Sequence, residues 1–228
     1  PLTLVLPKQS IIPDIVTSGL STVGIRCPDH YLTRQLLSEL PFPLAAPSAN
    51  PFGYVSPTTA EHVNNQLGHK IKYILDGGPC RIGLESTIVG FENDQAVIYR
   101  RGGVSEEEIS KVIGEMSYRL ASSNPVAPGQ LDSHYAPNKK LYLGDINELK
   151  KEFTGKKVGV LRFMGNSDSA DTYQLILSQS GNLEEAARNL FAALRQFDQM
   201  EIEVILAEPV PDSGIGKAIN DRLRRAAK

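Results

Sequence analysis

The chain has 228 residues, of which 41% are hydrophobic and 22% are charged, and its formal net charge is −2. A chain of this size can bury a hydrophobic core as one large domain or as two small ones. The net charge argues against a surface coated in basic residues for nucleic acid, but it leaves a weak RNA contact through a local basic groove open. The sequence contains no apolar run of about 18 residues, so it predicts no membrane-spanning helix.

The two cysteines, Cys27 and Cys80, form no Cys-x-x-Cys motif, and the four histidines do not cluster with them. This pattern predicts neither a disulfide framework nor a metal site, and it favours a reduced, cytoplasmic location. The sequence begins inside an apolar run, Pro1-Leu2-Thr3-Leu4-Val5-Leu6, without a signal-peptide pattern. We therefore expect that the N-terminal part of the first domain is absent from this chain.

Apolar and β-branched runs in the first half predict several strands and helices. The expected strands are residues 2–7, 22–26, 43–46, 71–76, 86–91 and 96–100, with a turn at Asn93-Asp94. One helix is expected over 31–40, and a second is expected to begin at Ser56-Pro57. A third is expected over 105–118, where Ser105 is the N-cap and acidic residues occupy the first turn.

Residues 121–138 contain three prolines and no helical periodicity, which predicts a linker. Beyond it, expected strands at 140–143, 158–163, 172–177 and 202–207 alternate with expected helices at 146–153, 183–199 and 216–227. Such alternation is typical of a small parallel-sheet domain. The fold class is therefore α/β, with a first domain over 1–120, an interdomain linker over 121–138 and a second domain over 139–228.

Ser48 and Asn50 directly follow the expected strand at 43–46, between Pro47 and Pro51. They are two residues apart, so an extended backbone would project both side chains from one face. This position, at the carboxyl end of a strand, is where open α/β sheets bind ligands. Taken alone, the same pattern is also typical of a polar turn between a strand and a helix.

Further polar groups occur at the ends of other expected strands. Arg26 and Arg100 each end a strand, and Ser86-Thr87 begins one. Guanidinium, hydroxyl and amide groups without a Cys/His nucleophile pair suit a polyanion such as phosphate better than covalent catalysis. Each arginine alone is more typical of a surface or ion-pair residue. Their common placement at strand ends favours a site.

Three features of the second half allow two interpretations. His134-Tyr135 in the linker would either fold over a pocket, or Tyr135 would pack between the domains. Gly214-Ile215-Gly216 opens a helix, which suits either anion binding or tight packing. The basic residues of the last helix would form a nucleic-acid surface or, as we expect, a solvated face: Lys217, Arg222, Arg224 and Arg225.

Motifs spread over nearly the whole chain occur together in one order: Pro1-Leu2-Thr3-Leu4-Val5-Leu6, Val23-Gly24-Ile25-Arg26-Cys27-Pro28-Asp29-His30, Pro47-Ser48-Ala49-Asn50, Glu85-Ser86-Thr87-Ile88-Val89, Tyr99-Arg100-Arg101-Gly102, Pro128-Gly129 with His134-Tyr135-Ala136-Pro137, and Gly214-Ile215-Gly216-Lys217-Ala218-Ile219-Asn220-Asp221-Arg222. Together they resemble the YrdC-like L-threonylcarbamoyladenylate synthases of the two-domain type. The resemblance implies a YrdC-like twisted open sheet with helices, here partial, joined by an extended linker to a small Rossmann-like parallel-sheet domain.

The resemblance implies synthesis of threonylcarbamoyl-AMP from L-threonine, bicarbonate and ATP, with release of pyrophosphate. The product would pass to a threonylcarbamoyl transferase machinery that modifies adenosine 37 of tRNA. Mg²⁺ would arrive with ATP, and no tightly bound cofactor is implied. By matching motif, Ser48, Asn50, Ser86 and Arg100 would bind the nucleotide. Arg26, as the catalytic residue, and Thr87 would contact threonine and the carbamate, and His134-Tyr135 would close over the pocket.

Two departures from the family pattern bear on activity. No Lys-x-Arg motif precedes Pro1, so this chain assayed alone is expected to show weak or no synthesis. Gln130-Leu131-Asp132-Ser133 stands where the family has a Met, a basic residue and an aromatic, so the linker is expected to dock differently or specificity to shift. The alternative function is a non-catalytic RNA- or nucleotide-binding module, whose RNA affinity would fall steeply with salt.

Overall fold

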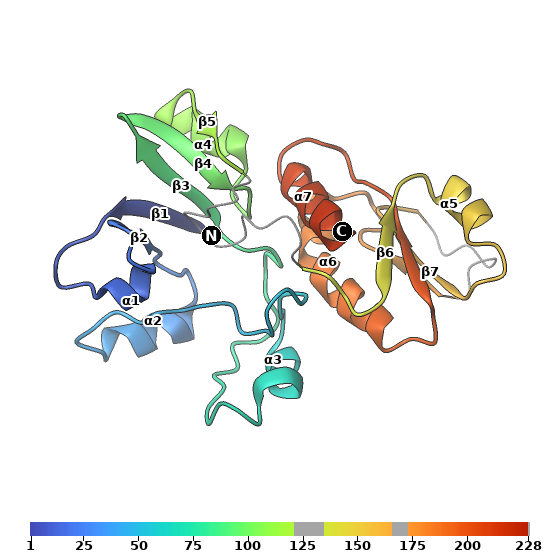
Figure 1. The fold of residues 1–228 in the computed structure, drawn as a ribbon, viewed down its shortest axis with the longest axis horizontal. Helices are drawn as coiled ribbons and strands as arrows, with labels where there is room; N and C mark the ends of the chain where they lie inside the picture. Colours follow the sequence, from blue (N-terminus) through green and yellow to red (C-terminus); the bar gives the residue numbers. More distant parts are fainter. Residues whose placement is uncertain (121–134, 166–172, 228) are drawn as a thin grey trace. The chain divides into compact units, whose positions relative to one another are not determined.

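The structure is a computed structural model that describes residues 1–120, 135–165 and 173–227 (Figure 1). It divides into two compact units. Unit 1 comprises Pro1–Pro47 and Glu85–Leu131, and unit 2 comprises Ser48–Leu84 and Asp132–Lys228. Residues 48–84, which the sequence assigned to the first domain, thus group with unit 2. The predicted boundaries at 120 and 139 stay a prediction, and most of the predicted linker lies outside the described residues.

Unit 1 contains a five-stranded mixed sheet in the order β2-β1-β3-β4-β5. Its strands are β1 (Leu2–Pro7), β2 (Thr22–Ile25), β3 (Thr87–Glu92), β4 (Gln95–Arg100) and β5 (Ser117–Tyr118). β1 runs parallel to β3, and β4 runs parallel to β5, while the other neighbours are antiparallel. The helices of this unit are α1 (Asp14–Thr17), α2 (Tyr31–Ser38) and α4 (Glu106–Ile113). The expected open α/β sheet is therefore confirmed.

Both faces of this sheet carry a small apolar cluster. On one face, Ile88 and Tyr99 pack with Val97 and Val5. On the other, Val89 and Ile98 pack against Ile109 of α4, so α4 covers this face. The helix expected at 31–40 is confirmed as α2, but every residue of α2 stays at least partly exposed. The core of unit 1 therefore lies around β3 and β4.

Four sequence expectations for local structure are wrong. Residues 43–46 and 71–76 are irregular backbone rather than strands. Prolines flank and interrupt the first of these runs, and each proline lacks the N–H that a strand ladder needs. The helix expected at Ser56 begins later, as α3 (Ala60–Leu67), because Thr59 rather than Ser56 caps it by accepting from the His62 N–H. The helix expected to reach residue 118 ends at Ile113, since Gly114 adopts a φ of 80°.

Unit 2 contains a four-stranded sheet in the order β6-β9-β7-β8, in which all neighbouring strands are parallel. Its strands are β6 (Lys140–Leu143), β7 (Val158–Arg162), β8 (Gln174–Ile176) and β9 (Val204–Ala207), and its helices are α3, α5 (Ile146–Glu152), α6 (Leu183–Asp198) and α7 (Gly216–Ala226). Residues of α6 and α7, such as Phe191 and Leu223, form one core with the sheet, and α5 packs in a second cluster. The predicted parallel-sheet domain is confirmed. None of the helices in the described ranges is long and apolar enough to cross a membrane.

Candidate functional site

Strand pairing in unit 1 gathers several of the predicted polar groups at one end of the sheet. Leu4 pairs with Ile25, so Arg26 follows β2 beside the start of β1. Thr3 pairs with Ile88, and Ile88 pairs in turn with Arg100 at the end of β4. Because β1 and β3 run parallel to each other and antiparallel to β2 and β4, respectively, the starts of β1 and β3 lie beside the ends of β2 and β4. Arg26, Ser86 and Arg100 therefore lie at the same end of four adjacent strands.

Ser86 and Arg100 are in direct contact at this edge. The Arg100 guanidinium donates from Nε and Nη2 to the Ser86 carbonyl, at 3.1 and 2.9 Å, and from Nη2 to Ser86 Oγ at 3.1 Å. Thr3 Oγ1 lies 2.7 Å from Ser86 Oγ. Both Ser86 and Arg100 are buried. A buried guanidinium with an adjacent hydroxyl is a donor set suited to an oxyanion such as phosphate.

Gly102 brings the chain that follows Arg100 against the turn at Ser86. A Cβ placed on Gly102 would lie 2.4 Å from the Glu85 carbonyl oxygen, from the Ser86 carbonyl carbon and from the Thr87 nitrogen. Gly103 N–H donates to the Glu85 carbonyl at 2.9 Å, which closes this contact. Only a residue without a side chain permits so close a backbone approach. Gly102 thereby helps to keep Arg100 beside Ser86.

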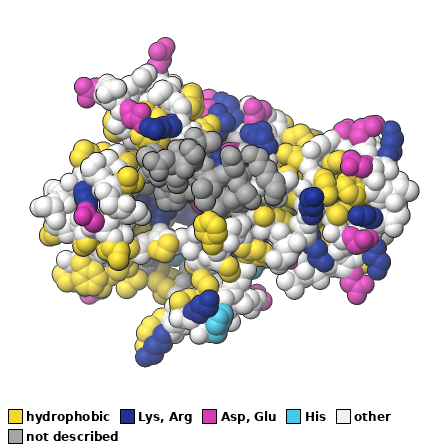
Figure 2. Space-filling model, in the orientation of Figure 1, with side chains coloured by type: hydrophobic (Ala, Val, Ile, Leu, Met, Phe, Trp, Pro, Cys, Tyr) yellow, Lys and Arg dark blue, Asp and Glu magenta, His cyan; other side chains and the backbone are white. Residues whose placement is uncertain are grey.

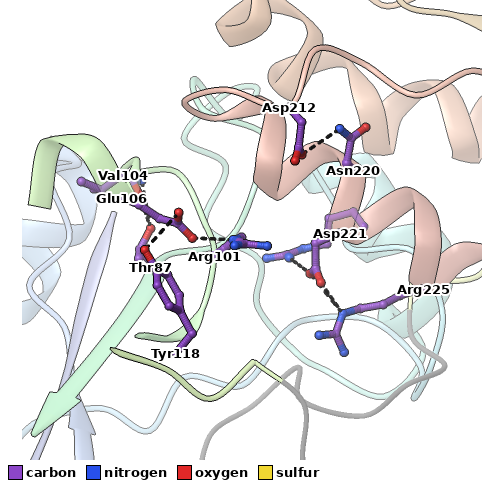
Figure 3. Close-up of polar contacts among 10 residues, drawn as sticks. Thr87, Arg101, Val104, Glu106, Tyr118, Asp212, Asn220, Asp221 and Arg225 are labelled. Atoms are coloured by element: carbon purple, nitrogen blue, oxygen red, sulfur yellow. Dashed lines mark hydrogen bonds and ion pairs between the residues drawn. The ribbon is translucent and has the colours of Figure 1, made fainter. Parts of the chain in front are cut away.

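Side-chain contacts of Thr87 and Arg101 also hold the chain that follows Arg100 (Figure 3). The Thr87 hydroxyl donates to the Val104 carbonyl at 2.6 Å and accepts from the Val104 N–H at 3.1 Å. Arg101 Nε lies 2.5 Å from Glu106 Oε1, and the Tyr118 hydroxyl donates to Glu106 Oε2 at 3.4 Å. Thr87 has no exposed surface. Its contact with threonine stays a prediction, and in this structure its hydroxyl ties β3 to the segment after Arg100.

Arg26 is exposed, and its guanidinium donates to the Ala46 carbonyl at 3.4 Å, close to the limit for a hydrogen bond. The side chain is thus held weakly and remains accessible to an anion. Its assignment to the threonine carboxylate stays a prediction.

Ser48 and Asn50 belong to unit 2. Ser48 is exposed. Asn50 Nδ2 donates to the carbonyls of Pro51 and Tyr54, at 2.9 and 3.1 Å, whereas its buried Oδ1 has no hydrogen-bond partner within the described ranges. The chain after Asn50 lines a cavity of about 380 Å³, together with Gln66, Ala136 and Asn138. Asn50 thus carries an acceptor that the described part of its unit leaves unused.

Tyr135 lies in the core of unit 2, with 2% of its surface exposed. Its ring stacks on Phe191 with a centroid distance of 5.5 Å, and the Arg222 guanidinium lies 4.9 Å from the ring centroid. The backbone of Tyr135 adopts a φ of 66°, which is uncommon for a residue with a side chain. The closing of Tyr135 over a pocket stays a prediction, and His134 lies outside the described residues.

The expectation of a solvated basic face on the last helix is wrong for Arg222 and Arg225, although Arg224 is exposed. Arg222 and Arg225 of α7 are buried, and both pair with Asp221. Arg222 Nη1 lies 2.6 Å from Oδ2. Arg225 Nε lies 3.0 Å from both carboxylate oxygens of Asp221 (Figure 3). A Cβ on Gly216 would lie 2.1 Å from the Pro211 carbonyl oxygen, which favours tight packing over anion binding at this helix start. Helical periodicity alone did not show that this face meets the core.

Sequence reasoning missed a second polar cluster, formed by Tyr54, Arg195 and Asp198 in unit 2. The Tyr54 hydroxyl donates to Asp198 Oδ2 at 2.6 Å, and the Arg195 guanidinium lies 4.9 Å from the Tyr54 ring centroid. Burial and then the hydrogen bond to Asp198 raise the pKa of Tyr54 to about 12. Burial also lowers the pKa of Arg195 from its ordinary value. The i, i+3 spacing of Arg195 and Asp198 on α6 was the only sequence signal.

The comparisons with known proteins place this chain in a family. Residues 104–228 match the family model described as "Threonylcarbamoyl-AMP synthase, C-terminal domain", and residues 1–102 match one described as "Telomere recombination". A relative from Pyrococcus abyssi named threonylcarbamoyl-AMP synthase is 42% identical over 243 residues, which cover 100% of this chain and 70% of that protein. The chain belongs to the threonylcarbamoyl-AMP synthase family. The family expected from the motifs is thereby confirmed.

Further matches have between 38% and 42% identity to this chain. A Bacillus subtilis threonylcarbamoyl-AMP synthase is 42% identical over 240 residues, covering 99% of this chain and 69% of that protein. The crystal structure of P. abyssi Sua5 complexed with L-threonine superposes with a TM-score of 0.90 at 41% identity, covering 99% of this chain and 70% of that one. A P. abyssi Sua5 in which an adjacent histidine and tyrosine are replaced by alanine gives 0.87 at 38% identity, covering 99% and 69%.

Proposed function

We propose that this protein forms L-threonylcarbamoyl-AMP from L-threonine, bicarbonate and ATP, with release of pyrophosphate. The product would supply a transferase machinery that installs N6-threonylcarbamoyladenosine at position 37 of tRNA. The observation that carries the proposal is the 42% identity, over the whole chain, to a P. abyssi protein named for this synthesis. A P. abyssi Sua5 structure of the same fold was solved with L-threonine.

This reaction requires stabilisation of negative charge on phosphate oxygens and needs no covalent nucleophile from the protein. The threonine nitrogen forms a C–N bond either to bicarbonate, which loses its hydroxyl group as water, or to CO₂, whose C=O π bond opens, and the nitrogen gives up a proton. A carbamate oxygen then attacks the α-phosphorus of ATP, so that a P–O bond forms as the P–O bond to pyrophosphate breaks. Negative charge builds up on phosphate oxygens in the transition state, where fixed cationic donors are most effective. The guanidinium cation of Arg100, which its hydrogen bonds hold beside Ser86, would supply such a charge.

We assign nucleotide roles to Ser86 and Arg100 in unit 1 and to Ser48 and Asn50 in unit 2, each on the basis of its own motif. The unused Oδ1 acceptor of Asn50 supports its assignment, since a nucleotide offers amino and hydroxyl donors. Arg26, exposed at the same sheet end as Arg100, would bind the threonine carboxylate and the carbamate. Mg²⁺ would arrive with the ATP phosphates; in the described ranges, no three His, Cys, Asp or Glu residues cluster to hold a metal ion.

The charge distribution favours an enzyme over an RNA-binding module. On the face of unit 2 visible in Figure 2, Lys and Arg side chains are interspersed with Asp and Glu rather than aligned in a basic stripe. Two basic residues of α7 are moreover buried in pairs with Asp221. A surface of this kind provides few phosphate contacts for a nucleic-acid backbone.

The test is an assay of the full-length protein with ATP, threonine and bicarbonate, in which pyrophosphate release and the adenylate are both measured. Release should require threonine. Arg100→Met should weaken ATP binding about 10- to 100-fold, as expected for the loss of a charged hydrogen bond. Arg119→Met, which removes an exposed arginine paired with Glu92 in the same unit, is the matched control and should keep wild-type affinity. Threonine-independent release, or none, would overturn the proposal.

A further inference from the structure

The last turn of α6 makes hydrogen bonds to Tyr54–Ser56, which begins four residues after Asn50. The stretch Tyr54–Ser56 is distant in sequence from α6, yet Arg195 and Asp198 make most of its polar contacts. All of these residues belong to unit 2. The arrangement raises the question of what α6 contributes to a loop that carries a candidate nucleotide-binding residue.

The Arg195 guanidinium donates from two of its nitrogens to this segment and to Gln66 of α3. Nη2 donates to the Val55 carbonyl at 2.5 Å and to Gln66 Oε1 at 2.9 Å, and Nε donates to the Ser56 carbonyl at 3.1 Å. The same group lies over the Tyr54 ring. Arg195 is 7% exposed and Val55 is fully buried. A planar, forked donor that bonds two successive carbonyls fixes the direction of the backbone as well as its position.

Asp198 joins this segment to the chain at residues 138–139. Its Oδ2 accepts from the Tyr54 hydroxyl at 2.6 Å and from the Asn138 N–H at 3.1 Å, and its Oδ1 accepts from the Lys139 N–H at 3.1 Å. The Ala136 N–H donates to the Gly53 carbonyl at 3.0 Å, beside these contacts. One carboxylate thus holds two chain segments that are more than 80 residues apart in sequence.

Tyr54 is one of two anchors of the Asn50 side chain, whose Nδ2 also donates to the Pro51 carbonyl at 2.9 Å. Asn50 Nδ2 donates to the Tyr54 carbonyl at 3.1 Å, and the Tyr54 N–H donates to the Pro51 carbonyl at 3.1 Å. These bonds close a tight turn whose far end is Tyr54. With Nδ2 engaged in this way, Oδ1 is left as the acceptor that the turn presents. A shift of Tyr54 would therefore rotate or release the Asn50 carboxamide.

We infer that Arg195 and Asp198 are positioning residues for the candidate nucleotide site: they clamp Tyr54–Ser56 and so hold Asn50 in one orientation. Neither residue touches the nucleotide in this account. The inference rests on the proposed function only through the nucleotide role of Asn50. It assigns to α6 of the second domain a task in the adenylation reaction in addition to its place in the core.

The test compares two arginines on α6. Arg195→Met removes the clamp, while Arg188→Met is the matched control, because Arg188 also donates to a backbone carbonyl of the 48–84 segment, that of Arg81 at 2.9 Å, but far from Asn50 in sequence. Hydrogen exchange of the peptide covering residues 48–56 is measured for both variants and for the wild type. We expect exchange about tenfold faster or more in Arg195→Met and unchanged exchange in Arg188→Met.

Steady-state kinetics then distinguish a positioning role of Arg195 from a contribution to stability alone. Misplacement of a binding group by about 1 Å costs up to about 100-fold, so Arg195→Met should raise the KM for ATP about 10- to 100-fold, with a smaller change in kcat. Arg195→Lys, which keeps the charge but loses the fork, should recover part of this loss, and Tyr54→Phe should give an intermediate effect. Arg188→Met should change KM by less than about twofold.

Two outcomes would overturn the inference. One is a lowered thermal midpoint for Arg195→Met with unchanged exchange at residues 48–56. The other is a wild-type KM for ATP despite faster exchange. If the wild-type protein released no pyrophosphate, the proposed function would fail by itself, whereas the exchange experiment would still show whether the clamp orders the turn.

Discussion

Gly102→Ala is predicted to destabilise unit 1 and to disturb the contact between Arg100 and Ser86. The new Cβ would stand 2.4 Å from three backbone atoms of residues 85–87, about 1 Å short of the 3.4 Å at which ordinary contact begins. Those atoms belong to the turn into β3 and cannot swing aside as a side chain can. Overpacking of this kind costs about 1–3 kcal/mol and occasionally more, so we expect a loss of about 3 kcal/mol in the free energy of unfolding.

Urea unfolding of the two-unit chain, followed by fluorescence and by circular dichroism, measures this loss for unit 1. Gly144→Ala is the matched control, since its Cβ would meet only Leu149, at 3.6 Å or more. The control should stay within about 0.5 kcal/mol of the wild type. ATP affinity should fall in Gly102→Ala alone, because Arg100 would leave Ser86. Wild-type stability of Gly102→Ala, or an equal loss in the control, would refute the steric argument.

Two further predictions concern single side chains. Thr87→Val leaves the N–H and carbonyl of Val104 without their hydroxyl partner. The free energy of unfolding, measured in urea, should therefore fall by about 1–3 kcal/mol. A raised KM for threonine in the same variant would instead indicate that Thr87 contacts the substrate. Burial, and next the Arg195 charge, lower the pKa of His62, so the unfolded chain binds more protons. Stability should therefore be full above the ordinary histidine pKa of about 6.5 and fall as the pH drops below it, and urea midpoints of His62→Gln should lack this fall.

Local patterns predicted much of the secondary structure, because they depend on neighbouring residues. Asn93 and Asp94 both adopt positive φ, 50° and 63°, as their place between two apolar runs indicated. Ser105 forms a complete capping box with Glu108. The run at 71–76 misled the prediction, because a short apolar stretch becomes a strand only if another strand pairs with it. The sequence of residues 71–76 does not itself show whether a partner strand is present.

The same distinction applies to the candidate site. Arg100 and Ser86 could be selected from sequence, as charged and hydroxyl groups at strand ends, and the structure places them in contact. Arg195 could not, because a lone arginine on an amphipathic helix looks like a solvated residue. Its role depends on the folding of residues 54–56 against α6, over more than 130 positions of sequence.

The sequence by itself determined the family, the alternation of strands and helices, and the types of side chain available to bind anions. Tertiary structure alone decided which charges are buried: Arg222 and Arg225 lie on the buried face of α7 rather than in solvent, and Tyr135 lies against Phe191. The physical reason is that periodicity and capping are set by residues a few positions apart. Burial and pairing are set by surfaces that meet only once the chain has folded.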